Sequence, residues 1–424
     1  MSKISNVPQI RFKGFTDDWE QRRLGEFGIS TGGTSIESEF VDDGDYKVIS
    51  IGSYSETSQY TDQGLRVNKT SKTSSRILNK NDLTMILNDK TSSGKIIGRV
   101  LIINEDDSYV YNQRTQRIEV NKDYFSPIFL YQYLNADNIR SKIIRAAQGN
   151  TQIYVNWTTI SEIEYTIPIN KREQEKIANY CKSLDTLITL HQRKYEYVVN
   201  FKKAMLEKMF PKDGSDIPEI RFKEFSGQKS DSWEAAKMSE IASVIDPHPS
   251  HRAPDVVYSG IPFIGIGDVD ETGEIDCSSA RTVHERIFEE HKKRYDLSIP
   301  SIGIGRVASL GKVIRLRNDI GKYAVSPTMA IIQFSRNVDN NYMYSFMCTA
   351  SFQKQFSSQG NGSTRQSVGI QDLRELMVLL PKKNREQETI GMYFNCLDNL
   401  CILYQRKLQQ LKKIKKAMLE KMFV

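Results

Sequence analysis

The chain has 424 residues, of which 39% are hydrophobic and 26% are charged, a composition that fits a globular protein of two or three domains. Lys and Arg (59) exceed Asp and Glu (52), so the net charge is +7 and an anionic partner would have to be bound by a local basic surface. No apolar run approaches the roughly 18 residues of a membrane span, so we expect no membrane-spanning helix.

The N-terminal segment and the cysteines indicate in which cellular compartment the protein is found. The opening segment MSKISNVPQIRFKGF lacks the hydrophobic core of a secretory signal. The five cysteines are odd in number and form no Cys-x-x-Cys pair. We therefore expect a cytoplasmic protein without disulfides or a zinc site.

Residues 1–170 are predicted to form a first domain of mixed α/β structure. It opens with VPQIRFKGF at Val7–Phe15, and Trp19 follows. Short β-branched segments separated by Gly, Asp, Asn and Ser predict strands in YKVISIGSYS, LTMILN, KIIGRVLIIN and QRIEV. A helical stretch is expected around Phe129–Ala146.

Residues 171–211 are predicted to form a long helix. Apolar residues recur at alternating steps of three and four, which is the pattern of a coiled-coil seam rather than of a strand. Pro168 prevents helix just upstream, and Asn170 and Glu173 have the spacing of a capping box. Pro211 then ends the helix.

The second half of the chain repeats the first. REQEKIANYCKSLDTLITLHQRK, from Arg172, returns as REQETIGMYFNCLDNLCILYQRK, from Arg385, an offset of 385 − 172 = 213 residues. IPEIRFKEF, from Ile217, matches the opening segment and is followed by Trp233, and KKAMLEKMF closes both copies. A repeat of this length decides the architecture.

The repeat predicts a second domain at residues 212–383 and a second long helix at residues 384–424. Strands are expected in IPFIGIGDV, SIPSIGIGRV, GKVIRL and MAIIQF, and a helical stretch around Tyr342–Phe356. Pro381 precedes the second helix as Pro168 precedes the first.

Two copies of one seam in one chain favour pairing of the two helices, although two unrelated core helices would be an alternative. We expect an antiparallel pair, because each helix must connect one variable region to the next through short connections. The predicted fold class is therefore α+β: two mixed α/β domains at opposite ends of a long antiparallel two-helix coiled coil, related by a pseudo-two-fold internal repeat. The predicted interface residues are Ile177, Leu184, Leu187, Val198, Phe201, Met205, Ile390, Leu397, Tyr404, Leu408, Leu411 and Met418.

Motifs of the common catalytic centres are not found. The five histidines are scattered, and His248 and His251 lack a third ligand at suitable spacing. The glycine-rich segments at Gly303–Gly311 and Gly94–Gly98 have neither dinucleotide-binding nor P-loop spacing and are better explained as turns. We find no G-x-S-x-G, no nuclease pattern and no amino-methyltransferase motif, so we expect no catalytic residue and no metal in this chain.

Polar and basic residues crowd corresponding places in both halves, as nucleic-acid readout requires for phosphates and base edges. Taken singly, each of these residues is most simply explained as a solvated surface residue. Because they recur at corresponding places in both halves, the group as a whole indicates DNA binding more strongly than any single residue does. The DNA-binding candidates are Lys90, Ser92, Lys95, Arg99, Asn112, Gln113, Arg114, Arg117, Gln148, Asn150, Thr151 and Gln152 in the first half, and Arg306, Ser309, Lys312, Ser326, Thr328, Asn361, Thr364, Arg365 and Gln366 in the second. Arg140, Lys142, Arg145, Arg315, Arg317, Lys354 and Gln359 lie nearby in sequence.

The whole layout resembles the specificity subunit of type I restriction-modification enzymes. The resemblance is carried by the two halves, the REQE openings, the AMLEKMF endings, the RFK-x-F segments at Arg11 and Arg221 and the Gly-Asn turns before each helix. It covers essentially residues 5–424. Each short peptide alone is unspecific, whereas the duplicated layout is specific.

The resemblance implies that each variable region is a target-recognition domain for one half of a split, double-stranded DNA site. It implies that the helices set the spacing and dock two methyltransferase subunits, which use S-adenosylmethionine to methylate adenine. It also implies two motor/nuclease subunits that use ATP and Mg²⁺, while this chain binds no cofactor. The alternatives are a single-chain DNA methyltransferase or nuclease with degenerate motifs, and a coiled-coil scaffold without DNA affinity.

Overall fold

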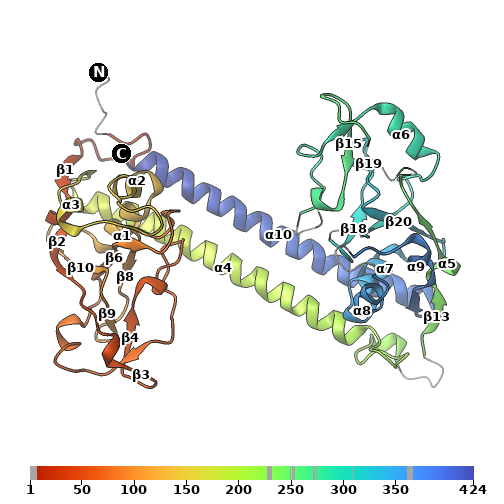
Figure 1. Cartoon of the computed structure of the whole chain (residues 1–424), viewed down its shortest axis with the longest axis horizontal. Coiled ribbons are helices and arrows are strands. Elements are labelled where there is room, and N and C mark those ends of the chain that lie inside the picture. The colour runs from red at the N-terminus through yellow and green to blue at the C-terminus, as the bar shows by residue number, and fades with distance from the viewer. Residues whose placement is uncertain are drawn as a thin grey trace. The chain divides into compact units, whose positions relative to one another are not determined.

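The computed structural model describes residues 7–226, 232–248, 250, 254–270, 273, 275–307, 309–360 and 366–424. The chain divides into two compact units. Unit 1 comprises residues 1–190 and 408–424, and unit 2 comprises residues 191–407. Each unit holds one variable region together with part of both long helices (Figure 1).

The core of unit 1 is an antiparallel four-stranded sheet in the order β2-β10-β6-β8. Its strands are β2 (Gly28–Gly32), β10 (Thr115–Val120), β6 (Leu83–Ile86) and β8 (Val100–Ile102). Helix α1 (Pro127–Asn135) packs against β8, and Ser126 begins it by accepting a hydrogen bond from the Phe129 amide. Helix α2 (Asp137–Arg145) follows at once, so the single helical stretch predicted here is two helices, divided where Ala136 is extended.

Three smaller sheets complete the strands of unit 1. β1 (Glu20–Arg23) pairs with β12 (Glu164–Ile167), and β7 (Asn88–Asp89) pairs with β11 (Ile153–Tyr154). The other sheet has the order β3-β5-β4-β9. Its strands are β3 (Phe40–Val41), β5 (Arg66–Val67), β4 (Tyr46–Ile49) and β9 (Tyr109–Tyr111); the short helix α3 spans Trp157–Ile160.

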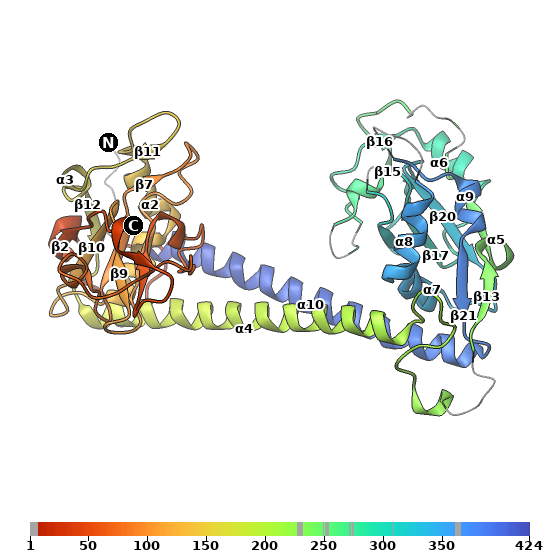
Figure 2. The same ribbon diagram turned by 60° about the horizontal axis from the view of Figure 1, so that its bottom comes forward.

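Unit 2 repeats the central sheet in the order β14-β20-β17-β18, of which β17 and β20 can be followed in Figure 2. The strands are β14 (Ala242–Ile245), β20 (Met329–Phe334), β17 (Ser301–Gly305) and β18 (Val313–Leu316). β13 (Glu234–Lys237) pairs with β21 (Met377–Leu380), as β1 pairs with β12 in unit 1. The predicted repeat therefore extends to strand order and pairing.

The rest of unit 2 largely corresponds to unit 1. A three-stranded sheet has the order β16-β15-β19, formed by Thr282–Val283, Ile261–Ile264 and Ala324–Val325. It matches β5-β4-β9 of unit 1, because β15 pairs antiparallel with β16 and parallel with β19, as β4 does with β5 and β9. The helices are α5 (Met238–Ile241), α6 (Glu285–Lys292), α7 (Asn340–Met347), α8 (Ala350–Ser358) and α9 (Ile370–Glu375). The helical stretch predicted at Tyr342–Phe356 is also two helices, because the Thr349 side chain caps the second by accepting from the Phe352 amide.

The long helices are α4 (Lys171–Met209) and α10 (Asn384–Met422). Within unit 1, the last turn of α10 packs against the first turns of α4, where Met422 shares a core with Ile177 and Cys181. Within unit 2, the end of α4 and the start of α10 share a core in the same sense. The helices are therefore antiparallel in each unit, and the predicted α+β fold with a paired-helix repeat is confirmed.

Candidate nucleic-acid interface

A buried ion pair anchors each variable region to its helix. The Arg11 guanidinium donates to both carboxylate oxygens of Glu173, at 2.7 and 2.8 Å, and the two side chains are 12% and 1% exposed. Arg221 and Glu386 repeat this pair at 2.6 and 2.7 Å, with the same exposure. This forked geometry fixes direction as well as distance, so the RFK and REQE motifs form one structural joint in each unit.

This joint replaces the predicted capping box. The Asn170 side chain does accept from the Arg172 amide at 3.0 Å, as a helix N-cap does. Glu173, however, binds Arg11 rather than the start of its own helix. A charged partner is preferred because a carboxylate that is 1% exposed needs a compensating cation.

The glutamine that follows each anchoring Glu ties the helix to the sheet. Gln174 donates to the Pro168 carbonyl at 2.9 Å and accepts from the Ser126 amide at 2.9 Å. Gln387 donates to the Pro381 carbonyl at 3.1 Å and accepts from the Asp339 amide at 3.2 Å. The Glu and Gln side chains of the REQE motif therefore fasten the first turn of each long helix to the variable region of the same unit; we call the glutamine contacts the glutamine bracket.

A second repeated ion pair crosses between the long helices. In unit 1, Lys415 donates to Asp185 at 2.6 Å, and Gln132 donates to the other oxygen at 2.7 Å. In unit 2, Lys202 and Arg315 both bind Asp398. The pairs are related by the 213-residue offset, since 185 + 213 = 398 and 202 + 213 = 415.

These lysines correct the predicted interface. Leu187 and Phe201, predicted in the seam, are 42% and 37% exposed. In the second half of α4, Lys202 occupies the inward position next to Phe201 because Asp398 attracts it from α10. Apolar periodicity alone could not find a charged seam position. The other predicted interface residues are buried (Ile177, Leu184, Val198, Ile390, Leu397, Leu408 and Leu411) or half-buried (Met205, Tyr404 and Met418).

One face of unit 1 gathers most of the candidate DNA-binding residues. The pairing of β7 with β11 brings the segment after Asn88 next to the segment before Tyr154. Gln148 and Tyr154 exchange two backbone hydrogen bonds of 2.9 Å, which closes the loop between them. Beside it lies a hollow of about 190 Å³ that Arg114, Gln116, Tyr154 and Trp157 help to line.

The exposed candidates of unit 1 lie in the loops after β7, before β10 and before β11. Arg114 is exposed and has a φ of 67°, because it sits in the tight turn that leads into β10. Tyr154, which the sequence reasoning missed, is 40% exposed and adds an aromatic surface. The exposed candidates are Lys90, Ser92, Lys95, Gln113, Arg114, Gln148, Asn150, Thr151 and Gln152.

Three other candidates of unit 1 are engaged inside the protein. Asn112 is 6% exposed, accepts from the Ile36 amide and donates to Glu37, which lowers the pKa of Glu37 to about 2 together with a larger contribution from Ser35. Arg117 binds Asp82 at 2.8 Å, yet burial still raises the pKa of Asp82. Arg99 donates to backbone carbonyls and to Ser58. These side chains support the face from beneath.

Unit 2 presents a smaller described set. Arg306 donates to the Val368 carbonyl at 3.0 Å and to Asp246 at 3.2 Å, and Lys312 donates to the Val269 carbonyl. Ser326 is 2% exposed and Thr328 is half-buried, whereas Ser309 and Gln366 are exposed. Asn361, Thr364 and Arg365 lie outside the described residues.

Within the described residues, the two buried cysteine thiols are not activated as nucleophiles. Burial raises the pKa of Cys181 to about 12 and that of Cys348 to about 11, so both thiols are protonated at neutral pH. Across the described ranges, no three His, Cys, Asp or Glu side chains form a group that could hold a metal ion. In the same ranges, none of the helices is both long and apolar enough to cross a membrane.

Comparison with known proteins places this architecture. The family model "Type I restriction modification DNA specificity domain" matches twice, at residues 16–200 and 231–413. The MjaVIII specificity subunit of a type I restriction enzyme from Methanocaldococcus jannaschii is 21% identical over 98% of this chain and 95% of that protein. A putative MjaX specificity subunit from the same organism is 20% identical over 79% of this chain and 76% of that protein.

Solved structures agree on the fold. The S subunit of a type I restriction-modification system from M. genitalium superposes with a TM-score of 0.68, at 14% identity over 99% of both chains. A chain from a study of complex assembly in the type I system gives a TM-score of 0.51, at 15% identity over 96% of this chain and 97% of that chain. The protein therefore belongs to the type I restriction modification DNA specificity family and carries that family's domain twice.

Proposed function

We propose that this chain is the DNA-reading subunit of a type I restriction-modification complex, in which each unit reads one half of a bipartite duplex site. One observation carries the proposal: the same joint, sheet and helix bracket occur twice, and each presents loops at the same end of the central sheet. Arg114 precedes β10 in unit 1, and Thr328 precedes the equivalent strand β20 in unit 2. Two such readers suit a two-part DNA site.

The face of unit 1 has the chemistry of duplex readout. Exposed Lys90, Lys95 and Arg114 can bind phosphates or guanine edges, while Asn150 and Gln152 can bind adenine edges. The buried and half-buried residues beneath them hold the loops in place. The chain itself performs no catalysis in this proposal and binds no cofactor.

The helices supply the surface for partner subunits. Leu187 and Leu190 of unit 1 are 42% and 45% exposed, and Tyr197, Met392 and Leu403 of unit 2 are 70%, 61% and 59% exposed. Exposed apolar side chains on helices are typical of protein interfaces. We propose that they dock two methyltransferase subunits, which use S-adenosylmethionine, and that two motor/nuclease subunits using ATP and Mg²⁺ join this assembly.

Two measurements test the proposal. Sequencing of methylated adenine in cells with and without the gene should reveal a bipartite motif that depends on the gene. Selection from a random duplex pool with the full chain should recover the same motif, with an affinity that falls steeply as salt rises. If the gene changes no methylated motif and the chain selects no sequence, the proposal is wrong.

A further inference from the structure

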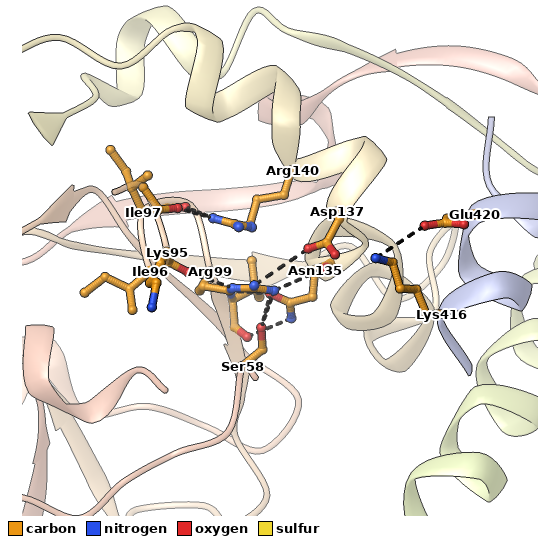
Figure 3. A network of polar contacts seen from close by, with 12 residues as sticks. Ser58, Lys95, Ile96, Ile97, Arg99, Asn135, Asp137, Arg140, Lys416 and Glu420 are labelled. Atoms are coloured by element: carbon orange, nitrogen blue, oxygen red, sulfur yellow. Dashed lines mark hydrogen bonds and ion pairs between the residues drawn. The ribbon is translucent and has the colours of Figure 1, made fainter. Parts of the chain in front are cut away.

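Two arginines of unit 1, one on a helix and one at the end of the Asp89–Gly98 loop, fasten the backbone of this loop (Figure 3). Arg140, on α2, donates to the Gly94 carbonyl at 2.8 Å and to the Ile97 carbonyl at 3.0 Å. Arg99, at the end of the loop, donates to the Lys95 carbonyl at 3.2 Å and to the Asn135 carbonyl at 3.2 Å. The loop is thereby fastened to the junction of α1 and α2.

The loop is also constrained from within. Asp89, 4% exposed, accepts from the Thr91 amide and from the Ile96 amide, both at 3.0 Å. Gly98 has a φ of +73°, and a Cβ there would lie 2.9 Å from the Ile143 side chain of α2. The backbone path is therefore narrowly determined, while the side chains of Lys90 and Ser92 remain exposed.

The character of Arg140 excludes a direct contact with DNA. Its side chain is buried, with the residue only 6% exposed, and its Nε lies buried without a hydrogen-bond partner. Burial lowers the pKa of Arg140 to about 10, which still leaves the guanidinium charged at neutral pH. Burying a charge on backbone carbonyls costs folding free energy, so the contact is expected to serve something other than stability.

Unit 2 holds its equivalent loop with a different residue at the same place. Gln353, on α8, lies 213 residues after Arg140 and donates to the Gly311 carbonyl at 2.9 Å and to the Met347 carbonyl at 2.7 Å. Gly311 lies 213 residues after Gly98 and also has a positive φ, of +79°. Both units therefore clamp the loop that precedes the last strand of the central sheet from one helix position.

We propose that Arg140 and Gln353 are positioning residues for DNA sequence readout, each holding the recognition loop of its own unit in one conformation. The inference rests on the proposed function, since the loops matter only if they face DNA. The clamp acts through the loop backbone and leaves the side chains at the tip free to contact bases. Removing the clamp from one unit should therefore lower the sequence discrimination of that unit and leave that of the other unit unchanged.

The test compares Arg140→Met and Gln353→Met in the full chain by selection from a random duplex pool. Methionine removes the donors and leaves an unbranched apolar side chain, which has the length of glutamine and is shorter than arginine. The loop carbonyls then lose their donor, which lowers stability, so folding of each variant is checked by thermal unfolding. We expect Arg140→Met to reduce discrimination in one half-motif by about tenfold, the scale of a well-made base contact. Gln353→Met should do the same to the other half-motif. Amide exchange in residues 89–98 should accelerate only in Arg140→Met.

Controls separate this clamp from a general effect. Arg23→Met removes the same charge from an exposed ion pair with Glu162, and Gln371→Met alters an exposed glutamine of unit 2; both should leave the motif unchanged. If the wild-type chain selects no motif, the proposed function fails. If the wild type selects a motif and both clamp variants, folded by thermal unfolding, select it with unchanged discrimination, the clamp is wrong. If Arg140→Met does not fold, Gln353→Met alone decides the question.

Discussion

Units 1 and 2 share a framework of polar contacts and differ in the loops and smaller elements attached to that framework. The Arg–Glu joint, the glutamine bracket and the cross-helix Asp–Lys pair recur at equivalent positions. The β5-β4-β9 sheet of unit 1 also has its counterpart in β16-β15-β19 of unit 2. In contrast, unit 1 has β3 at the edge of this sheet, whereas unit 2 has α6 between β16 and β17. The polar joints and the sheets therefore belong to the shared scaffold, and the two units differ in their loops and in these smaller elements.

The strongest test of the shared framework is the buried joint. Glu173→Ala should destabilise unit 1, and Glu386→Ala unit 2, each by roughly 3–5 kcal/mol, because each removes the carboxylate that binds a largely buried guanidinium through two hydrogen bonds. Amide exchange, read separately in the cores of the two units, measures this. Glu162→Ala, which removes an exposed partner of Arg23, should cost less than about 1 kcal/mol. Clearly unequal losses in the two units would break the comparison.

Acid should distinguish the units, because all five histidines lie in unit 2. His291 is fully buried, bonded to His248 at 3.0 Å and to Tyr295 at 3.1 Å; burial first, and then His248, lower the pKa of His291 to about 4. The unfolded chain then binds a proton that the folded unit does not. Stability is therefore complete above pH 6.5 and falls as the pH drops from 6.5 towards 4.

The expected loss in unit 2 over this window is about 3 kcal/mol, at about 1.4 kcal/mol for each pH unit. Amide exchange at pH 7, 5.5 and 4.5 should show it in unit 2 and much less in unit 1. His291→Gln should remove most of the pH dependence of unit 2. An equal acid loss in both units, unchanged by His291→Gln, would assign the effect to carboxylates instead.

The cross-helix pairs should differ in strength. Asp398 is 9% exposed and bound by two cations, whereas Asp185 is half-buried and bound by one cation and a glutamine. Asp398→Asn should therefore cost about 2 kcal/mol in unit 2, and Asp185→Asn about 1 kcal/mol in unit 1. Double-mutant cycles with Lys202 and Lys415 measure the coupling. A larger effect at Asp185 would reverse the predicted order.

The smallest predicted effect concerns a tyrosine hydroxyl that is supplied from different helix positions in the two units. In unit 1, Tyr133 donates to the Thr166 carbonyl at 2.8 Å, and in unit 2 Tyr342 donates to the equivalent Leu379 carbonyl at 2.5 Å. The offset aligns Tyr342 with Phe129 instead, one helical turn earlier. Tyr133→Phe should cost about 1 kcal/mol, and adding Phe129→Tyr should recover part of it, as measured by unfolding of unit 1. No recovery would show that the two carbonyls are not equivalent.

The sequence allowed the duplication, both helices and their antiparallel pairing to be predicted, because a 213-residue repeat of an apolar seam specifies all three. It did not reveal Lys202 and Lys415 in the seam, although Asp185 and Asp398 recur at the repeat offset and could have suggested it. Nor did it predict that Arg11 binds Glu173, since that contact joins residues 162 positions apart.

The candidate interface was predicted as a group rather than residue by residue. Arg114 and the 148–152 loop are exposed on one face, as expected of a reader. Asn112 and Arg140, drawn from the same basic and polar segments, are buried supports. Composition cannot separate these roles, because a guanidinium that clamps a backbone and one that contacts a base require the same residue type.

The most direct test of two independent readers on one framework is Arg114→Ala in the full chain, compared with wild type by selection from a random duplex pool. Arg114 is an exposed residue of unit 1. The half-motif that unit 1 reads should therefore lose discrimination by about 10- to 100-fold, while the half-motif that unit 2 reads is recovered unchanged. Equal weakening of both half-motifs, or no change in either, would contradict the account.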